Sequence, residues 1–183
     1  PYTLQGDKLI HGTGYGVYIF EDCTSLSTVT FNETYLNHAT FIPKGMFKGC
    51  VSLHELYFYD SLTKLDVNVF SPSITEVREE AFMNTWVSTD SSDPEIGVIE
   101  LPAACLKIGE HAFYNSDITT AYLRAESQIE FGIEVFQNSK IEHVEFTFIS
   151  EFSERIFDNC IYLSTVIIYE NGLKGADNTL SSD

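Results

Sequence analysis

The chain has 183 residues, of which 44% are hydrophobic, and it includes 14 Phe and 10 Tyr. This length and apolar content predict one folded domain with a sizeable core and exclude a disordered chain. Asp and Glu outnumber Lys and Arg by 27 to 10, which gives a formal net charge of −17. Such an acidic field disfavours nucleic acids and anionic membranes as partners. No run of about 18 apolar residues occurs, so we expect no direct membrane insertion.

One phrase recurs along the chain. It begins with Phe, has Cys or a small residue three positions later, and ends in spaced apolar residues. Self-similarity with a period in the twenties predicts a solenoid, in which each unit is stable only when stacked on its neighbours. Aligned on its first residue, the phrase begins at Phe20, Phe47, Phe70, Phe82, Phe113, Phe136 and Phe157.

The interval of 12 residues between Phe70 and Phe82 is too short for a full unit. Either Phe70 is a false match inside an insertion, or a strand has been lost there. We favour the second interpretation, a degenerate repeat.

Each complete unit ends in a short stretch in which apolar and polar residues alternate, as in a half-buried strand. These stretches predict parallel strands at Val29–Phe31, Leu56–Phe58, Ile99–Leu101, Ala121–Leu123, Val144–Phe146 and Val166–Ile168. The segment that leads into each Phe, such as Ile108–Phe113, predicts an extended stretch followed by a single helical turn. Long helices are excluded, because no stretch keeps a period of 3.6 residues for three turns.

Three of the four cysteines, Cys23, Cys50 and Cys160, occupy the position three residues after the repeated Phe, where other copies have Ser116 or Ser139. This exchange predicts a small buried residue. Parallel side chains on neighbouring units are poorly aimed for a disulfide, so we predict free thiols, including Cys105. No Cys-x-x-Cys or His-x-x-x-His spacing occurs, and no metal or other cofactor is expected.

The motif Ile108-Gly-Glu-His-Ala-Phe113, together with the phrase that follows Phe20, Phe47 and Phe157, resembles the BspA-type leucine-rich repeat. Leu101-Pro102 matches the Pro that ends the strand in that family's consensus. The resemblance covers residues 15–168. It implies a leucine-rich-repeat-like repeat solenoid, with short parallel β-strands on the concave face and irregular or short helical turns on the convex face.

We therefore expect one leucine-rich-repeat domain over residues 1–183, with about six to seven repeats. Residues 1–14 form a partial first repeat in this interpretation, and residues 171–183 form a frayed tail because periodicity is lost there. A chain that begins with Pro1 instead of Met indicates a fragment of a longer protein. Terminal repeats without caps expose apolar ends, so end-to-end self-association is a further expectation.

The resemblance also implies export to a microbial cell surface, a role in adhesion, and no shared catalytic residues. We accordingly expect a non-enzymatic recognition module, secreted or on the cell surface, that binds a protein or glycan partner. The acidic net charge favours a basic partner. The alternative is an intracellular or architectural scaffold, located in the cytoplasm.

Residues between the buried apolar positions of each strand face solvent, and several of them are Tyr. Tyr combines a large apolar contact area with a polar tip and is enriched at binding surfaces. The predicted partner-binding residues are Tyr57, Tyr59, Tyr122, Arg124, Glu145, Ile167 and Tyr169. The alternative is that Tyr simply suits strands and that these rings pack on each other.

Overall fold

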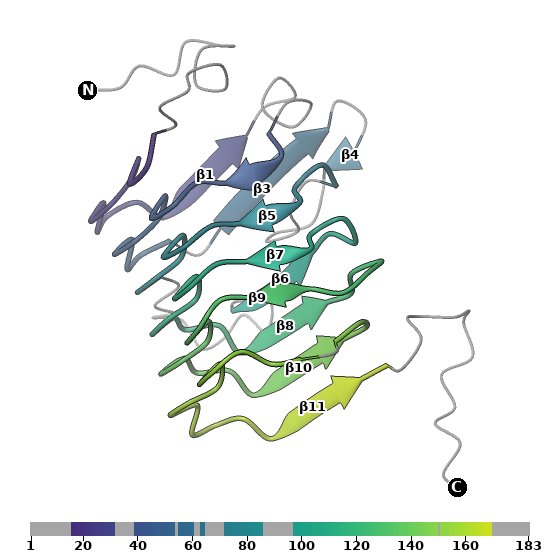
Figure 1. Ribbon diagram of the computed structural model, residues 1–183. Coiled ribbons are helices and arrows are strands. Elements are labelled where there is room, and N and C mark those ends of the chain that lie inside the picture. The colour runs from purple at the N-terminus through teal and green to yellow at the C-terminus, as the bar shows by residue number, and fades with distance from the viewer. Residues whose placement is uncertain are drawn as a thin grey trace, which may run out of the picture.

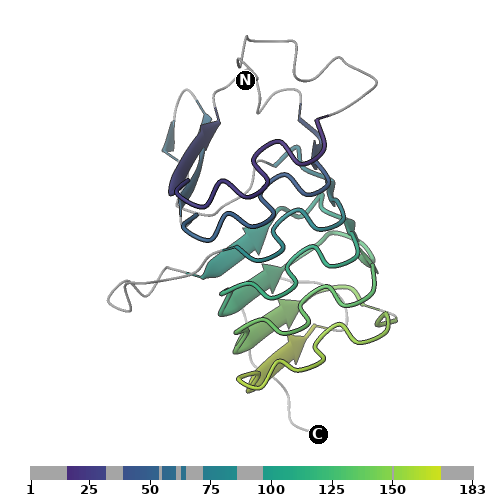
Figure 2. The same cartoon turned by 90° about the vertical axis from the view of Figure 1, so that its left-hand side faces the viewer.

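The computed structural model describes residues 16–31, 39–53, 55–60, 63–64, 72–85, 97–149 and 151–169. Within these ranges the chain winds into stacked coils and contains no helix (Figures 1 and 2). One side of the stack carries the longer strands β1 (Thr28–Phe31), β3 (Glu55–Asp60), β6 (Val98–Leu101), β8 (Thr120–Leu123), β10 (His143–Phe146) and β11 (Thr165–Ile168). A second side carries β2 (Phe41–Ile42), β5 (Glu76–Val77), β7 (Lys107–Ile108) and β9 (Glu130–Phe131). The remaining strand is β4 (Thr63–Lys64).

The longer strands confirm the predicted parallel solenoid. Along the sheet β6-β8-β10-β11, Val98 pairs with Thr120, Thr120 with His143, and His143 with Thr165. Every coil therefore presents the same repeat position at the same level. The alternating apolar residues point inward, and Ile99, Leu101, Ala121, Leu123, Val144 and Phe146 are all buried.

The longer strands form two sheets, whereas the sequence predicted a single ribbon. β1 and β3 are parallel and belong to a three-stranded sheet of order β1-β3-β4, and β6 begins the four-stranded sheet. β4 is antiparallel to β3, with Tyr59 opposite Lys64. β4 lies on the edge of β3 that faces away from β1, and it pairs only with Tyr59 and Asp60, beyond the four residues of β3 that pair with β1.

The segments before Phe47, Phe82, Phe113 and Phe136 are extended, as predicted, and their two-residue strands pair in parallel in the order β2-β5-β7-β9. The prediction of a helical turn is wrong. Two residues with positive φ flank each Phe, as Glu134 (54°) and Asn138 (60°) flank Phe136. Left-handed residues close tight turns and break a helix. In these turns the N–H groups of Glu134, Phe136 and Asn138 donate to carbonyls of the next coil.

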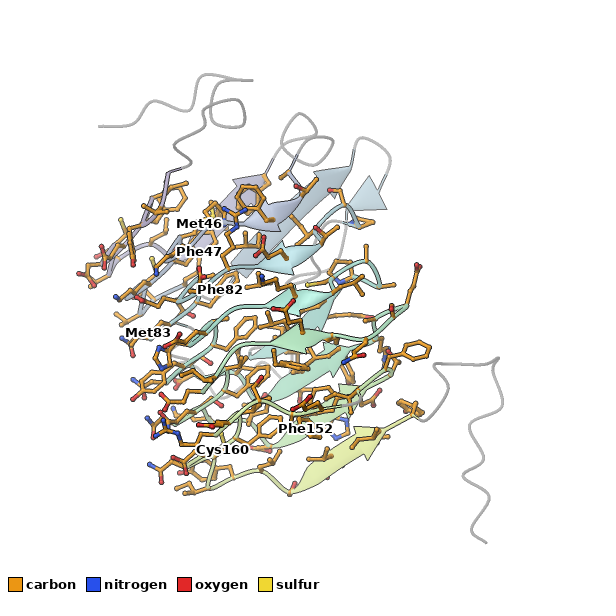
Figure 3. The ribbon with its side chains drawn as sticks, viewed as in Figure 1. Met46, Phe47, Phe82, Met83, Phe152 and Cys160 are labelled. Carbon is orange, nitrogen blue, oxygen red and sulfur yellow. The ribbon has the colours of Figure 1, made fainter. Side chains whose placement is uncertain are left out.

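The repeated phenylalanines form a stacked column in the core. Ring centroids are 5.6 Å apart for Phe20–Phe47, 5.2 Å for Phe47–Phe82, 5.4 Å for Phe82–Phe113, 5.3 Å for Phe113–Phe136 and 5.6 Å for Phe136–Phe157. Two neighbouring members of this column, Phe47 and Phe82, are labelled in Figure 3. Offset stacking of this kind stabilises aromatic pairs beyond their burial.

Phe70 lies outside the described residues. Phe47 stacks directly on Phe82, and its N–H donates to the carbonyl of Ala81 at 2.8 Å. The coils of Phe47 and Phe82 are therefore neighbours, and the degenerate repeat that we favoured does not separate them.

The position three residues after each Phe is a polar column beside the rings. All four cysteines are free thiols, as predicted; Cys23 is exposed and Cys50, Cys105 and Cys160 are buried. The Cys50 Sγ donates to the Phe20 carbonyl at 3.0 Å. Burial raises the pKa of Cys50 to about 12 and that of Cys105 to about 11. These thiols are therefore inert packing residues.

Candidate functional site

The four-stranded sheet brings the predicted outward-facing residues into one row. Glu100 of β6 is paired with Tyr122 of β8, Tyr122 with Glu145 of β10, and Glu145 with Ile167 of β11. In-register parallel strands lie about 4.8 Å apart, so side chains at one repeat position are direct neighbours.

Arg124, which follows β8, joins three members of this row. Its Nε and Nη2 donate to Glu145 Oε2 at 3.2 and 2.8 Å, and its Nη1 lies 3.6 Å from Glu100 Oε1. The guanidinium carbon also lies 4.3 Å from the centroid of the Tyr122 ring. A planar guanidinium suits both contacts, since it can stack on an aromatic face while its edge donates to carboxylates.

His143 completes the group from β10. Its Nε2 lies 3.1 Å from Glu145 Oε1, and its ring is 6.0 Å from the Tyr122 ring at an interplanar angle of 62°. We call Glu100, Tyr122, Arg124, His143 and Glu145 the strand-face cluster. Our predicted set of partner-binding residues omitted Glu100 and His143, although Glu100 lies one repeat period, 22 residues, before Tyr122, and His143 pairs with Thr120, 23 residues earlier.

The charged forms of Arg124 and Glu145 stabilise each other. Burial alone raises the pKa of Glu145, but hydrogen bonds from Arg124 and His143 outweigh it and lower the pKa below the ordinary 4.5. Burial likewise lowers the pKa of Arg124, and the hydrogen bond to Glu145 with nearby carboxylate charge raises it overall. The two carboxylates of Glu100 and Glu145 outnumber the single guanidinium of Arg124, and the Glu100 side chain is 45% exposed.

The other predicted residues are not part of this cluster. Tyr57 and Tyr59 belong to β3 in the separate three-stranded sheet, and their side chains are outside what the structure describes. Ile167 lies beside Glu145 on the last strand and is half-buried. Tyr169 follows that strand, where its N–H donates to the Phe146 carbonyl at 2.9 Å.

The described ranges hold neither a metal site nor a membrane-spanning element. No three His, Cys, Asp or Glu side chains in them converge in a way that could hold a metal ion. No helix in the same ranges has the length and apolar character needed to cross a membrane.

Comparison with known proteins gives one family match. The family described as BspA type Leucine rich repeat region matches residues 12–75 and 75–180, with six copies. Among solved structures, the chain is similar to a leucine rich cell surface protein from Faecalibacterium prausnitzii A2-165, with 16% sequence identity and a TM-score of 0.38. That alignment covers 82% of this chain and 62% of the other. No curated protein matches the sequence.

Proposed function

Because this chain belongs to the BspA-type leucine-rich repeat family, we propose that it is a non-enzymatic recognition module of a microbial cell-surface or secreted protein. Its contact surface for a protein or glycan partner is the strand-face cluster. Solenoids use the extended faces of their stacked repeats to bind partners. Adhesion is the role that this proposal assigns to the module.

The observation that carries this proposal is the fixed position of Arg124. The guanidinium is held at once by Glu145, at 2.8 Å, and by the Tyr122 ring, at 4.3 Å. A partner therefore meets side chains that are already ordered, and the entropy cost of immobilising them on binding is reduced. Tyr and Arg are also the side chains that most often dominate binding energy at interfaces.

The charge of the cluster favours a basic partner. Glu100 and Glu145 contribute two carboxylates against the single cation of Arg124, and Glu100 is open to solvent. The whole chain has a formal net charge of −17, which attracts cationic surfaces from a distance. We therefore favour a protein segment with exposed Lys or Arg over a neutral glycan.

The test uses arrays of host surface proteins and of glycans, probed with the full chain and then with variants. Tyr122→Ser removes the ring beneath Arg124 and is expected to weaken binding about tenfold or more, as for a hot-spot residue. Tyr57→Ser, on the three-stranded sheet, asks whether that sheet also contributes. Tyr114→Ser is the matched control, because Tyr114 packs beside His111 in the turn region away from the strands.

Circular dichroism should show that all three variants keep the fold. Binding by Tyr122→Ser that equals binding by the Tyr114→Ser control would remove the strand-face cluster as the contact surface. If the chain binds only anionic or neutral members of the arrays, the preference for a basic partner is contradicted.

A further inference from the structure

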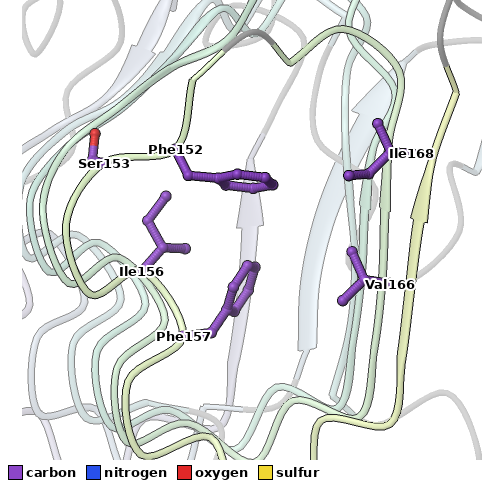
Figure 4. A pocket seen from close by; sticks show the side chains of 6 residues that line it. All are labelled: Phe152, Ser153, Ile156, Phe157, Val166 and Ile168. Atoms are coloured by element: carbon purple, nitrogen blue, oxygen red, sulfur yellow. The ribbon is translucent and has the colours of Figure 1, made fainter.

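The last described coil leaves the interior of the stack open. Val166 and Ile168 on β11 are 44% and 45% exposed, whereas the corresponding Val144 and Phe146 on β10 are fully buried. Phe152 is 42% exposed at the same end. Figure 4 shows these side chains facing one another across a pocket of about 300 Å³, lined by Phe152, Ser153, Ile156, Phe157, Val166 and Ile168.

The backbone of this coil also has N–H groups that no backbone carbonyl of the described ranges accepts. In each preceding coil, three backbone N–H groups donate to carbonyls of the next coil. They belong to the repeated Phe and to the residues two positions before and two positions after it. For example, Phe136 N donates to Ile156 O at 2.9 Å. Within the described part of the chain, the equivalent N–H groups of Arg155, Phe157 and Asn159 have no backbone acceptor.

The first coil has the complementary acceptors. In every later coil, three carbonyls accept hydrogen bonds from the N–H groups of the preceding coil. They belong to the residues three positions before, one position before and one position after the repeated Phe. In the Phe20 coil these are the carbonyls of Val17, Ile19 and Glu21, which accept no backbone N–H within the described ranges. Phe20, Ile19, Leu26 and Val29 are only partly buried there.

We propose that the two ends dock on each other, so that the first coil of a second copy stacks on the Phe157 coil. The three N–H groups that have no backbone acceptor in the described ranges then meet the three carbonyls that have no backbone donor there, and Phe20 of the second copy extends the described column beyond Phe157. The same contact covers Val166 and Ile168 with the strand side of the first coil. Open strand edges are known templates for pairing with another chain.

Docking of one end on the opposite end leaves the outer ends free. Such a head-to-tail contact is not limited to a dimer and gives an open series of oligomers. The net charge of −17 on each copy opposes association. Since salt screens this repulsion beyond a Debye length of about 10 Å at 0.1 M, association should rise with ionic strength.

The first experiment is sedimentation velocity of the full chain over a range of concentration and salt. The chain should form reversible oligomers that grow in size with concentration. Ile168→Lys places a charge in the apolar contact and should abolish them, although it reduces the net negative charge. Ile161→Lys is the matched control, because Ile161 is in the same coil and already 78% exposed; it should leave association unchanged.

A charge exchange tests the direction of stacking. Side chains one residue after the Phe touch between coils in two places: Gln137 Nε2 lies 2.8 Å from Asp158 Oδ2, and Lys48 Nζ lies 3.7 Å from Glu21 Oε1. Head-to-tail docking therefore puts Asp158 beside Glu21 of the second copy. Asp158→Lys should strengthen association about twofold to fivefold. Adding Glu21→Lys to it should reverse the gain, although net charge then moves still closer to zero.

Four outcomes would overturn the proposal. The first is a chain that stays monomeric at every concentration and salt. The second is oligomers that Ile168→Lys leaves intact. The third is a double variant that associates more strongly than Asp158→Lys alone. The fourth is a chain that associates only after residues 170–183 are deleted, which would make that segment the occupant of the open end.

Discussion

At the scale of single residues, the tight packing of neighbouring coils is clearest at a glycine that faces the backbone of the coil beside it. A Cβ added to Gly132 would lie 2.3 Å from the backbone nitrogen of Glu110 and 2.7 Å from its Cα. Backbone atoms cannot move aside without shifting a whole coil. The backbone path at residue 132 therefore leaves no room for a Cβ, and the reason is steric and not a special φ angle, although equivalent positions in other coils hold Arg78 and Ser153.

We predict that Gly132→Ala lowers the free energy of unfolding by about 1–3 kcal/mol, as expected for overpacking of a tight interior. Urea denaturation measures this loss. Ser153→Ala is the control, because Ser153 holds the equivalent position in the last coil and already has a Cβ. It should lose only the hydrogen bond to the Phe131 carbonyl, worth about 1 kcal/mol. Equal stability of Gly132→Ala and the parent chain would contradict the steric argument.

The turn residues explain why the prediction of a helical turn was wrong. The sequence has Asp, Gly or Asn two positions after each Phe of the stacked column: Asp22, Gly49, Asn84, Asn115, Asn138 and Asn159. These are the types that tolerate positive φ, and all six adopt it. That column was available as evidence against a helical turn. The left-handed position two residues before each Phe was not available as evidence, since Glu80, Glu134 and Arg155 occupy it without any such preference.

At the scale of elements, the strands were the most predictable feature. Each coil repeats the same alternation, and a slip of one residue would turn residues such as Val144 and Phe146 outward. The pattern therefore determined the register as well as the positions of the long strands. It could not reveal β4 or the division between β3 and β6, because the two residues of β4 carry no periodic signal.

The cluster between β8 and β10 makes stability depend on pH. Because hydrogen bonds lower the pKa of Glu145 in the folded chain below 4.5, its stabilising contribution is complete above the unfolded pKa. It is lost as pH falls through the folded pKa. We predict that Glu145→Gln is less stable than the parent chain at neutral pH and that the difference shrinks as pH falls from the unfolded pKa through the lowered folded pKa. Urea denaturation across this range is the measurement; a difference that stays constant with pH would contradict it.

For the whole molecule, stability should follow the one-dimensional order of the stack. Each coil touches only its neighbours, so the total is close to a sum of coil and interface contributions. The ends of such a stack open more easily than its middle. The sequence showed the repeat period and hence this order. The meeting of Arg124 with Tyr122 and Glu145 depends on exact side-chain placement, which the period alone does not specify.

This order predicts different consequences for two identical substitutions. Phe113 is fully buried between Phe82 and Phe136, with centroids at 5.4 and 5.3 Å. Phe157 stacks on Phe136 at 5.6 Å at the open end. We predict that Phe113→Ala costs about 3–5 kcal/mol and uncouples the coils on its two sides. Phe157→Ala should cost less, because the ring is only partly buried.

Backbone hydrogen exchange distinguishes the two cases. Phe113→Ala should speed exchange on both sides of the break, including the N–H groups of Phe82 and Phe136, which donate across coil boundaries at 2.8 and 2.9 Å. Phe157→Ala should affect mainly residues 151–169 and the N–H groups that donate to them. If Phe157→Ala instead speeds exchange throughout the stack, the coils act as one cooperative unit. Nearest-neighbour stacking would then be the wrong description of this solenoid.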